Sequence, residues 1–219
     1  MAAVPDFQRA RSTAAKQLRE SAILDAARAL GAGRGIRQIT LTDIADAVGM
    51  HKSALLRYFE TREEIFLRLT ADGWREWSAA LRAELGLITG PDPAAAVAAA
   101  FAATLAARGF FCDLLAQAPL NLERNVSAEA VRAFKLVTLA EVADIVAAVR
   151  RVLPALTQGD GVDLIAAATS MSGAFWQMAT PGPELAALYR SDPRLAHAVV
   201  EVEPRVARLL TAMLRGLPG

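Results

Sequence analysis

Apolar residues recur at the spacing of an α-helix along almost the whole chain, and the alternation typical of strands is nearly absent. Residues 23–30 carry Ile, Ala, Ala and Leu at positions i, i+3, i+4 and i+7. Residues 206–213 carry Val, Leu, Leu and Met at the same spacing. This spacing places apolar side chains on one face of a helix. The sequence therefore predicts an all-α fold.

Cap residues, glycines and prolines indicate where the helices begin and end. Thr40 and Asp43 form a capping-box pattern, and Asp92-Pro93 combines a cap residue with proline at the first helical position. Glycines at 31, 33 and 35 predict the end of the first helix. We expect helices over 13–30, 41–48, 61 into the eighties, from 93 onward, 109–117, 127–153, 160–179, and a last pair over 192–217 broken at Pro204.

The composition indicates a large aliphatic core without covalent cross-links. Of the 219 residues, 54% are hydrophobic and 6% are aromatic, which excludes a disordered chain. The single cysteine, Cys112, allows no internal disulfide and no cysteine-based zinc cluster. We interpret Cys112 as a buried small side chain and expect a cytoplasmic protein.

A mean hydropathy of +0.29 raises the question of a membrane span. The strongest candidate is the run of twenty uncharged residues 164–183, but five Ser, Thr and Gln residues interrupt it and acidic residues flank it. A membrane anchor favours Lys or Arg at its ends. We therefore interpret the run as a buried or partner-facing helix, and the amino terminus shows no secretory signal.

The charge divides the chain into two parts. Residues 1–78 carry twelve Lys or Arg against ten Asp or Glu, a net charge of +2, whereas residues 79–219 have a net charge of −1. The glycines and proline of residues 86–91 favour a boundary nearby. We expect a domain over 1–80, with a basic arm over 1–15, and a larger helical domain over 81–219.

Residues 41–60 have the pattern of a helix-turn-helix. Two closely crossing helices need a small residue where their backbones approach, a glycine at the turn and apolar residues facing inward. Ala45 is the small residue and Gly49 the turn. The inward positions are Ile44, Val48, Leu55 and Phe59. Any tight helix pair needs these same residue types, so the pattern alone does not establish DNA binding.

The outward face of the second helix consists of hydrogen-bond donors. These donors suit phosphates and base edges. They are His51, Lys52, Ser53, Arg57 and Tyr58.

With this context, the first 75 residues resemble the DNA-binding domain of the TetR (tetracycline repressor) family of bacterial regulators. The matching segments are 23–27, 39–45, 48–50 and 58–66. The resemblance implies a homodimer whose paired amino-terminal domains enter successive major grooves of a near-palindromic operator in double-stranded DNA. It also implies that the carboxy-terminal domain dimerises and binds a small effector, which releases a repressor from its operator.

Carried over by position, the resemblance assigns roles in DNA contact. Thr40 and Thr42 match phosphate contacts, Tyr58 matches an aromatic that touches the backbone, and Arg62 stands where a lysine is common. We expect His51, Lys52 and Ser53 to read sequence, and Arg57, Tyr58 and Arg62 to anchor phosphates. Two positions depart from the family pattern: His51 replaces a capping serine and Leu56 replaces a phosphate-contacting tyrosine.

Other function classes have less support. An enzyme needs convergent titratable residues, but the chain has two histidines in separate domains and no GxSxG, HExxH or P-loop pattern. We therefore expect no catalytic residue, no metal site and no cofactor. The alternative to a regulator is a helical dimer that binds a ligand or protein partner without specific DNA binding.

Aromatic and methionine residues of the carboxy-terminal part suggest an apolar effector pocket. Ordinary core packing also explains each of them. Few charges stand near them, so a neutral, hydrophobic effector is the expectation. The residues expected to line the pocket are Phe101, Phe111, Phe134, Met171, Phe175, Trp176 and Gln177.

The apolar surface of residues 164–183 and 204–217 exceeds what a monomer leaves in water. We expect these two helices to pair with their copies as a four-helix bundle between subunits.

Overall fold

The structure is a computed structural model that describes the backbone of residues 6–217 and the side chains of residues 14–217. Within this range the chain folds into ten α-helices and three short 3-10 helices, without strands, so the prediction of an all-α fold is confirmed. The elements are α1 (Asp6–Arg34), η1 (Ile36–Gln38), α2 (Leu41–Ala47), α3 (Lys52–Leu55), α4 (Arg62–Gly86), α5 (Pro93–Ala106), α6 (Gly109–Gln117), η2 (Leu122–Arg124), α7 (Ala128–Val152), α8 (Gln158–Ala179), α9 (Pro183–Ser191), η3 (Pro193–Ala198) and α10 (Val202–Gly216).

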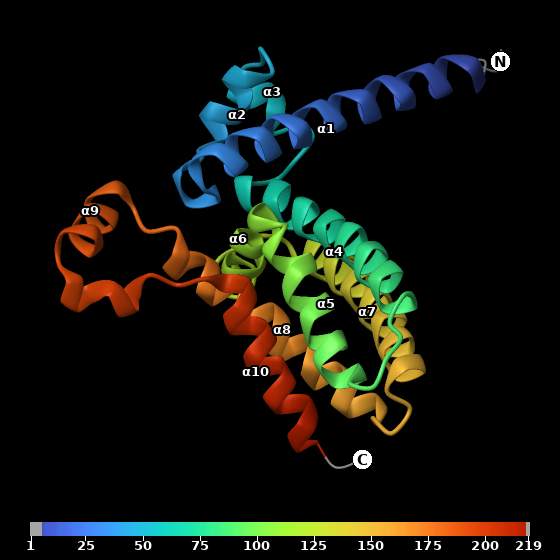
Figure 1. Cartoon of the computed structure of the whole chain (residues 1–219). Coiled ribbons are helices and arrows are strands. Elements are labelled where there is room, and N and C mark those ends of the chain that lie inside the picture. The colour runs from blue at the N-terminus through green and yellow to red at the C-terminus, as the bar shows by residue number, and fades with distance from the viewer. Residues whose placement is uncertain (1–5, 218–219) are drawn as a thin grey trace.

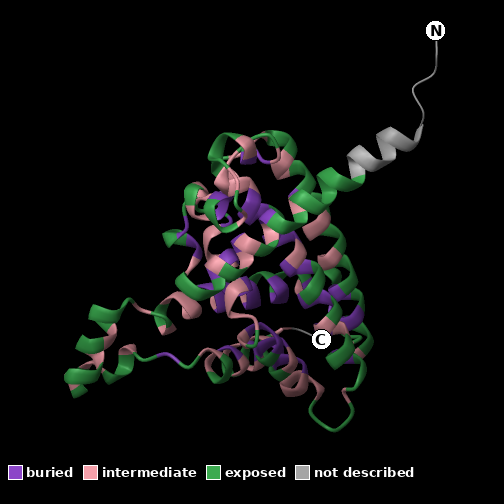
Figure 2. Ribbon diagram, turned by 90° about the horizontal axis from the view of Figure 1, so that it is seen from above, coloured by how far each residue is buried: buried purple, intermediate pink, exposed green. Residues whose placement is uncertain are grey.

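Two groups of helices are visible in Figure 1. The helices α1 to α3 form a head, and α4 runs from the head along the helical body. In the body α4 packs against α7, α6 packs against α8, and α10 packs against α5 and α8. Buried residues concentrate where these helices face one another, as Figure 2 shows. We call residues 14–61 the head and residues 87–217 the body, with α4 shared between them.

The first helix is longer than predicted. It continues past Gly31 and Gly33 to Arg34, and the chain turns at Gly35, which has a φ of 79°. Gly31 is a packing position, because a Cβ there would lie 2.6 Å from the Phe110 ring. The predicted end near Leu30 is therefore wrong by about one turn. Of the predicted basic arm, residues 1–5 lie outside the described residues.

The predicted caps of the head and body are present. The Thr40 hydroxyl accepts a hydrogen bond from the Asp43 amide at 3.1 Å, and the Asp43 carboxylate accepts one from the Thr40 amide at 2.7 Å. The hydrogen bonds from Thr40 lower the pKa of Asp43 to about 2. Asp92 caps α5 through the amide of Ala95 at 3.1 Å, ahead of Pro93.

The centre of the body is aromatic. The Trp77 ring is fully buried, lies 5.9 Å from Phe101 and 6.0 Å from Phe111, and donates its indole N–H to the Thr104 hydroxyl at 3.0 Å. Gly73 makes room for this packing, because a Cβ there would lie 2.3 Å from the Phe111 ring.

The carboxyl end differs from the prediction in two ways. α9 occupies residues that we expected to connect helices, and α10 passes through Pro204 instead of breaking there. Pro204 stands in the first turn of α10, where a missing N–H removes no helical hydrogen bond. The bounds of α7 and α8 agree with the predicted ones to within two residues.

Among the helices of residues 6–217, none taken singly is long and apolar enough to cross a membrane. α5 and α6 taken together, with an 89° bend between them, meet that test by length and composition.

The environment of Cys112 predicts an unreactive thiol. Cys112 is buried and its Sγ lies 3.3 Å from the Leu105 carbonyl, and burial raises the pKa of the thiol to about 12. The nucleophilic thiolate is therefore suppressed at pH 8 in the folded state. We expect iodoacetamide to modify Cys112 in urea but not in buffer, as measured by intact mass. Rapid modification of the folded protein would contradict this packing.

Candidate DNA-binding surface and effector sites

The second helix of the helix-turn-helix is short and is attached to the core by buried side chains. α3 spans Lys52–Leu55, and the buried side chains of Leu55 and Phe59 attach it to the core. His51 is its N-cap residue but makes no side-chain capping hydrogen bond. His51, Lys52 and Ser53 are all exposed, so the structure brings the three predicted sequence-reading residues together at the amino end of α3.

The turn lies at Gly49, as the sequence predicted, and this glycine has a left-handed backbone conformation. Gly49 has a φ of 64°, and the Met50 amide reaches back to the Ala45 carbonyl at 2.9 Å. A Cβ on Gly49 would meet nothing within 4 Å, so glycine is needed for its conformation and not for space. Ile44 and Ala45 are buried on the inner face.

The residues predicted to contact phosphates lie around α3 and differ in exposure and in their hydrogen bonds. Thr40, Thr42 and Arg57 are exposed, and Tyr58 is half-buried. The Thr40 hydroxyl already donates to the Asp43 carboxylate at 2.5 Å, so its first role is to cap α2. Leu56, one of the two departures from the family pattern, is 44% exposed on this surface.

Arg62 faces inward. Its guanidinium donates hydrogen bonds to the carbonyls of Ile36 and Ile39, lies 2.8 Å from a Glu63 carboxylate oxygen, and stacks 4.8 Å from the centre of the Phe66 ring. The side chain is 16% exposed. The geometry therefore does not support the expected phosphate contact, and instead Arg62 ties η1 to the start of α4. Sequence position alone does not distinguish these roles, since both use an arginine at a helix start.

Family models account for nearly all of the described chain. Residues 23–69 match the model for bacterial regulatory proteins of the tetR family, and residues 71–219 match the model for the tetracyclin repressor-like C-terminal domain. The chain belongs to the TetR family. As a member, it is a DNA-binding transcriptional regulator with a small-molecule effector.

Solved structures of low sequence identity share the TetR fold. A tetR-family regulatory protein from Rhodococcus RHA1 is 18% identical, with a TM-score of 0.56 over 90% of this chain and 95% of that one. FadR of Thermus thermophilus, in complex with lauroyl-CoA, is 20% identical, with a TM-score of 0.53 over 84% of this chain and 95% of that one. RolR in complex with resorcinol is 16% identical, with a TM-score of 0.54 over 94% and 98%. Comparison with curated protein sequences gave no match.

The predicted effector residues of this TetR regulator do not line one cavity in the described structure. Phe101 and Phe111 belong to the aromatic core around Trp77. Phe175 lies under Arg205, whose guanidinium carbon is 5.5 Å from the ring centre, and Met171 is half-buried on α8. Phe134 lines one cleft, and Trp176 and Gln177 line another.

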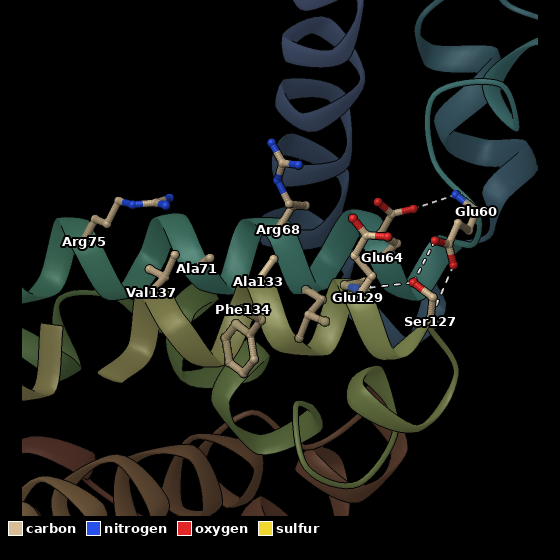
Figure 3. Close-up of a pocket in the computed structure, with 12 residues that line it drawn as sticks. Glu60, Glu64, Arg68, Ala71, Arg75, Ser127, Glu129, Ala133, Phe134 and Val137 are labelled. Carbon is tan, nitrogen blue, oxygen red and sulfur yellow. Dashed lines mark hydrogen bonds between the residues drawn. The ribbon is translucent and has the colours of Figure 1, made fainter. Parts of the chain in front are cut away.

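The cleft with Phe134 is a groove between α4 and α7, with a volume of about 460 Å³ (Figure 3). Leu67, Ala71, Phe134 and Val137 supply apolar lining, and carboxylates stand at the end near the head. Glu64 is half-buried, whereas Glu60 and Glu129 are exposed. Burial and the neighbouring charge of Glu60 raise the pKa of Glu64, although the Glu60 amide donates a hydrogen bond to its carboxylate at 2.5 Å.

The cleft with Trp176 and Gln177 lies at the junction of head and body and has a volume of about 680 Å³. We call it the junction cleft. Its head wall comes from residues 31–38, and its body wall from α6, the end of α8 and residues 180–183. The Trp176 ring packs closely against Gly109, where a Cβ would be 2.1 Å from the ring.

Asp113 links the head to the body, and sequence reasoning missed it. This α6 residue is 7% exposed, and its carboxylate accepts hydrogen bonds from the Ile36 amide at 2.8 Å and from the Gln177 amide nitrogen at 2.8 Å. A second link joins Glu60 to Ser127, whose hydroxyl donates at 2.8 Å. The available signal was the single charge in the otherwise uncharged helix 109–117, because a carboxylate in an apolar helix needs donors.

The exposed face of α3 supports a prediction for Lys52. Lys52→Ala removes a cation from the amino end of α3 without touching the core, so the operator Kd should rise by about tenfold or more. The free energy of unfolding should stay within about 0.5 kcal/mol of wild type. Lys135→Ala is the control, since it removes the same charge from an exposed site on α7. Equal operator affinity of the two variants in fluorescence anisotropy would reject this reading face.

Proposed function

We propose that this TetR regulator is a cytoplasmic homodimeric repressor whose two heads bind successive major grooves of a near-palindromic operator. The observation that carries the proposal is the exposed group His51, Lys52 and Ser53 at the amino end of α3, above the buried anchor of Leu55 and Phe59. We assign DNA reading to residues 1–80 and dimerisation and effector binding to residues 81–219. Thr40, Thr42, Arg57 and Tyr58 are the proposed phosphate contacts.

Selection of bound duplexes from a random pool tests the DNA-binding part of the proposal. A homodimer should enrich two inverted half-sites whose centres are separated by about one helical turn, or a multiple of it. Binding of the selected duplex should exceed that of a scrambled duplex at every salt concentration, because base contacts are less salt-dependent than phosphate contacts. If no duplex exceeds non-specific binding, the alternative of a helical dimer without specific DNA binding is favoured.

The outer faces of α8 and α10 are the proposed dimer surface. On α8 the exposed residues Ala166, Ser170, Ala174 and Met178 recur every fourth position, and Ala212 is exposed on α10. Small residues allow two helices to approach closely, as in a four-helix bundle between subunits. Sedimentation should give the mass of a dimer at micromolar concentration, and a monomeric mass would contradict this part of the proposal.

We propose the junction cleft as the effector site, with Trp176 and Gln177 from the predicted set and Phe110 as additional apolar lining. A ligand there touches head and body at once, which is what coupling two sites requires. The structural neighbours in complex with lauroyl-CoA and resorcinol carry ligands with apolar parts, which supports a hydrophobic effector. We assign no catalytic role to the two histidines, which lie in the head and in η3.

Thermal denaturation with a panel of neutral apolar, aromatic and polyanionic compounds tests the effector proposal. A ligand that binds the native state raises the midpoint in proportion to the logarithm of its concentration. Neutral apolar compounds should raise it in wild type and less in Trp176→Ala. Stabilisation by polyanions alone would contradict a hydrophobic effector, and an equal shift in both proteins would exclude the junction cleft.

A further inference from the structure

The segment between α8 and α10 projects from the body. Residues 180–201, which we call the arm, contain α9 and η3 and extend away from the helical layers on the side of α8 and α10 (Figures 1 and 2). Among the described residues of α9 and η3, none is buried. The body therefore covers little of α9 and η3.

The arm has an apolar face that the single chain leaves in water. Leu185 and Leu188 stand at i and i+3 on α9 and are 43% and 49% exposed, and Val199 is 61% exposed. α9 packs chiefly against η3, which belongs to the same arm. A nine-residue helix has marginal stability in water without tertiary packing, so a surface that covers this face would stabilise α9.

The position of the arm indicates what covers it. Its two ends are the carboxyl end of α8 and the amino end of α10, so the arm is continuous with the proposed dimer surface and extends beyond it. In a two-fold dimer through this surface, any contact between an arm and the other copy is made twice. We propose that the arm packs against the second copy of this chain, with Leu185 and Leu188 as the contact residues. This inference rests on the proposed homodimer.

The arm also connects dimer contact to the head. Its first residues, Thr180 to Pro183, line the junction cleft opposite the head segment 31–38. An arm held by the partner fixes one wall of this cleft, so the partner's position bears on the site where head and body meet. Contact between the arm and the partner is thereby coupled to the head through the junction cleft, in addition to any coupling through α4.

Two neighbouring substitutions on α9 test the contact. Leu188→Asp places a carboxylate on the apolar face, and Ala187→Asp adds the same charge on the side of α9 that carries Arg190. Both positions are exposed in the single chain, so neither change should unfold a monomer. We expect Leu188→Asp to raise the dimer Kd by about a hundredfold in sedimentation equilibrium, because each dimer loses two buried leucines. Ala187→Asp should stay within about threefold of wild type.

A photo-crosslinking benzoylphenylalanine in place of Leu185 locates the contact directly. Isotopically heavy and light chains are mixed, exchanged and irradiated, and heavy–light peptide pairs then identify crosslinks between copies. We expect such mixed pairs from the arm. Crosslinks within one chain alone, or a dimer Kd unaffected by Leu188→Asp, would overturn the arm contact while leaving the homodimer intact. A monomeric wild-type protein would instead overturn the homodimer and the arm contact together.

Discussion

Arg62→Ala should lower the free energy of unfolding by about 2–4 kcal/mol, since it removes two charge-assisted hydrogen bonds and leaves the Ile39 carbonyl without its donor. The guanidinium holds the Ile36 and Ile39 carbonyls, the Glu63 carboxylate and the face of Phe66. Its low exposure of 16% limits screening by water. Urea denaturation followed by circular dichroism measures the loss.

The comparison of Arg62→Ala with Arg57→Ala separates structural support from phosphate contact. Arg57 is exposed beside α3, so its removal should leave stability within about 0.5 kcal/mol of wild type. A lost phosphate contact lowers the slope of log Kd against log salt by about one, and we expect this for Arg57→Ala. Arg62→Ala should keep the wild-type slope at temperatures where it is folded. If Arg62→Ala had wild-type stability and a reduced slope of log Kd against log salt, Arg62 would be a phosphate contact after all.

Local signals in the sequence predicted the head well. The Thr40–Asp43 capping box, the left-handed Gly49 and the buried anchor of Leu55 and Phe59 depend on residues a few positions apart. Side-chain hydrogen bonds and backbone preferences at this range act almost independently of the rest of the fold. The helix-turn-helix could therefore be placed without knowledge of the body.

The errors arose where a distant part of the chain decides the outcome. Gly31 was interpreted as a helix end because Phe110, far along the chain, had no known position beside it. Arg62 was assigned to phosphate because the Ile36 and Ile39 carbonyls were not known to converge on it. α9 was missed because nine residues are too few for a clear helical spacing pattern, so we interpreted them as a connection.

Amino-acid composition did not predict which aromatic residues line a pocket. Aromatic residues of the body were assigned to one pocket, but Phe101 and Phe111 surround Trp77 and fill the core instead. Both uses bury the same apolar surface, so hydrophobicity cannot distinguish a core aromatic from a pocket aromatic. The polar residue Gln177 was more informative, because its amide nitrogen binds Asp113 at the junction of head and body.

Asp113→Ala should detach α6 from the head. The substitution leaves the Ile36 amide and the Gln177 side chain without their buried acceptor, so the free energy of unfolding should fall by about 2–4 kcal/mol. Asp144→Ala is the matched control, because its carboxylate is 59% exposed in a surface pair with Arg82. That control should cost about 0.5 kcal/mol or less.

Hydrogen exchange provides a readout that overall stability does not. In wild type the Ile36 amide donates to Asp113 at 2.8 Å, whereas the Ile39 amide donates to the Ile36 carbonyl within η1 at 3.3 Å. Asp113→Ala should therefore speed exchange at Ile36 more than at Ile39 under conditions where the protein stays folded. Gln177→Ala removes a body partner of the same carboxylate and should leave the Ile36 amide protected. If Ile36 stays protected in Asp113→Ala as well, α6 does not hold the head through this carboxylate, and coupling between the junction cleft and the DNA-binding face would have to run through α4 or through the link between Glu60 and Ser127.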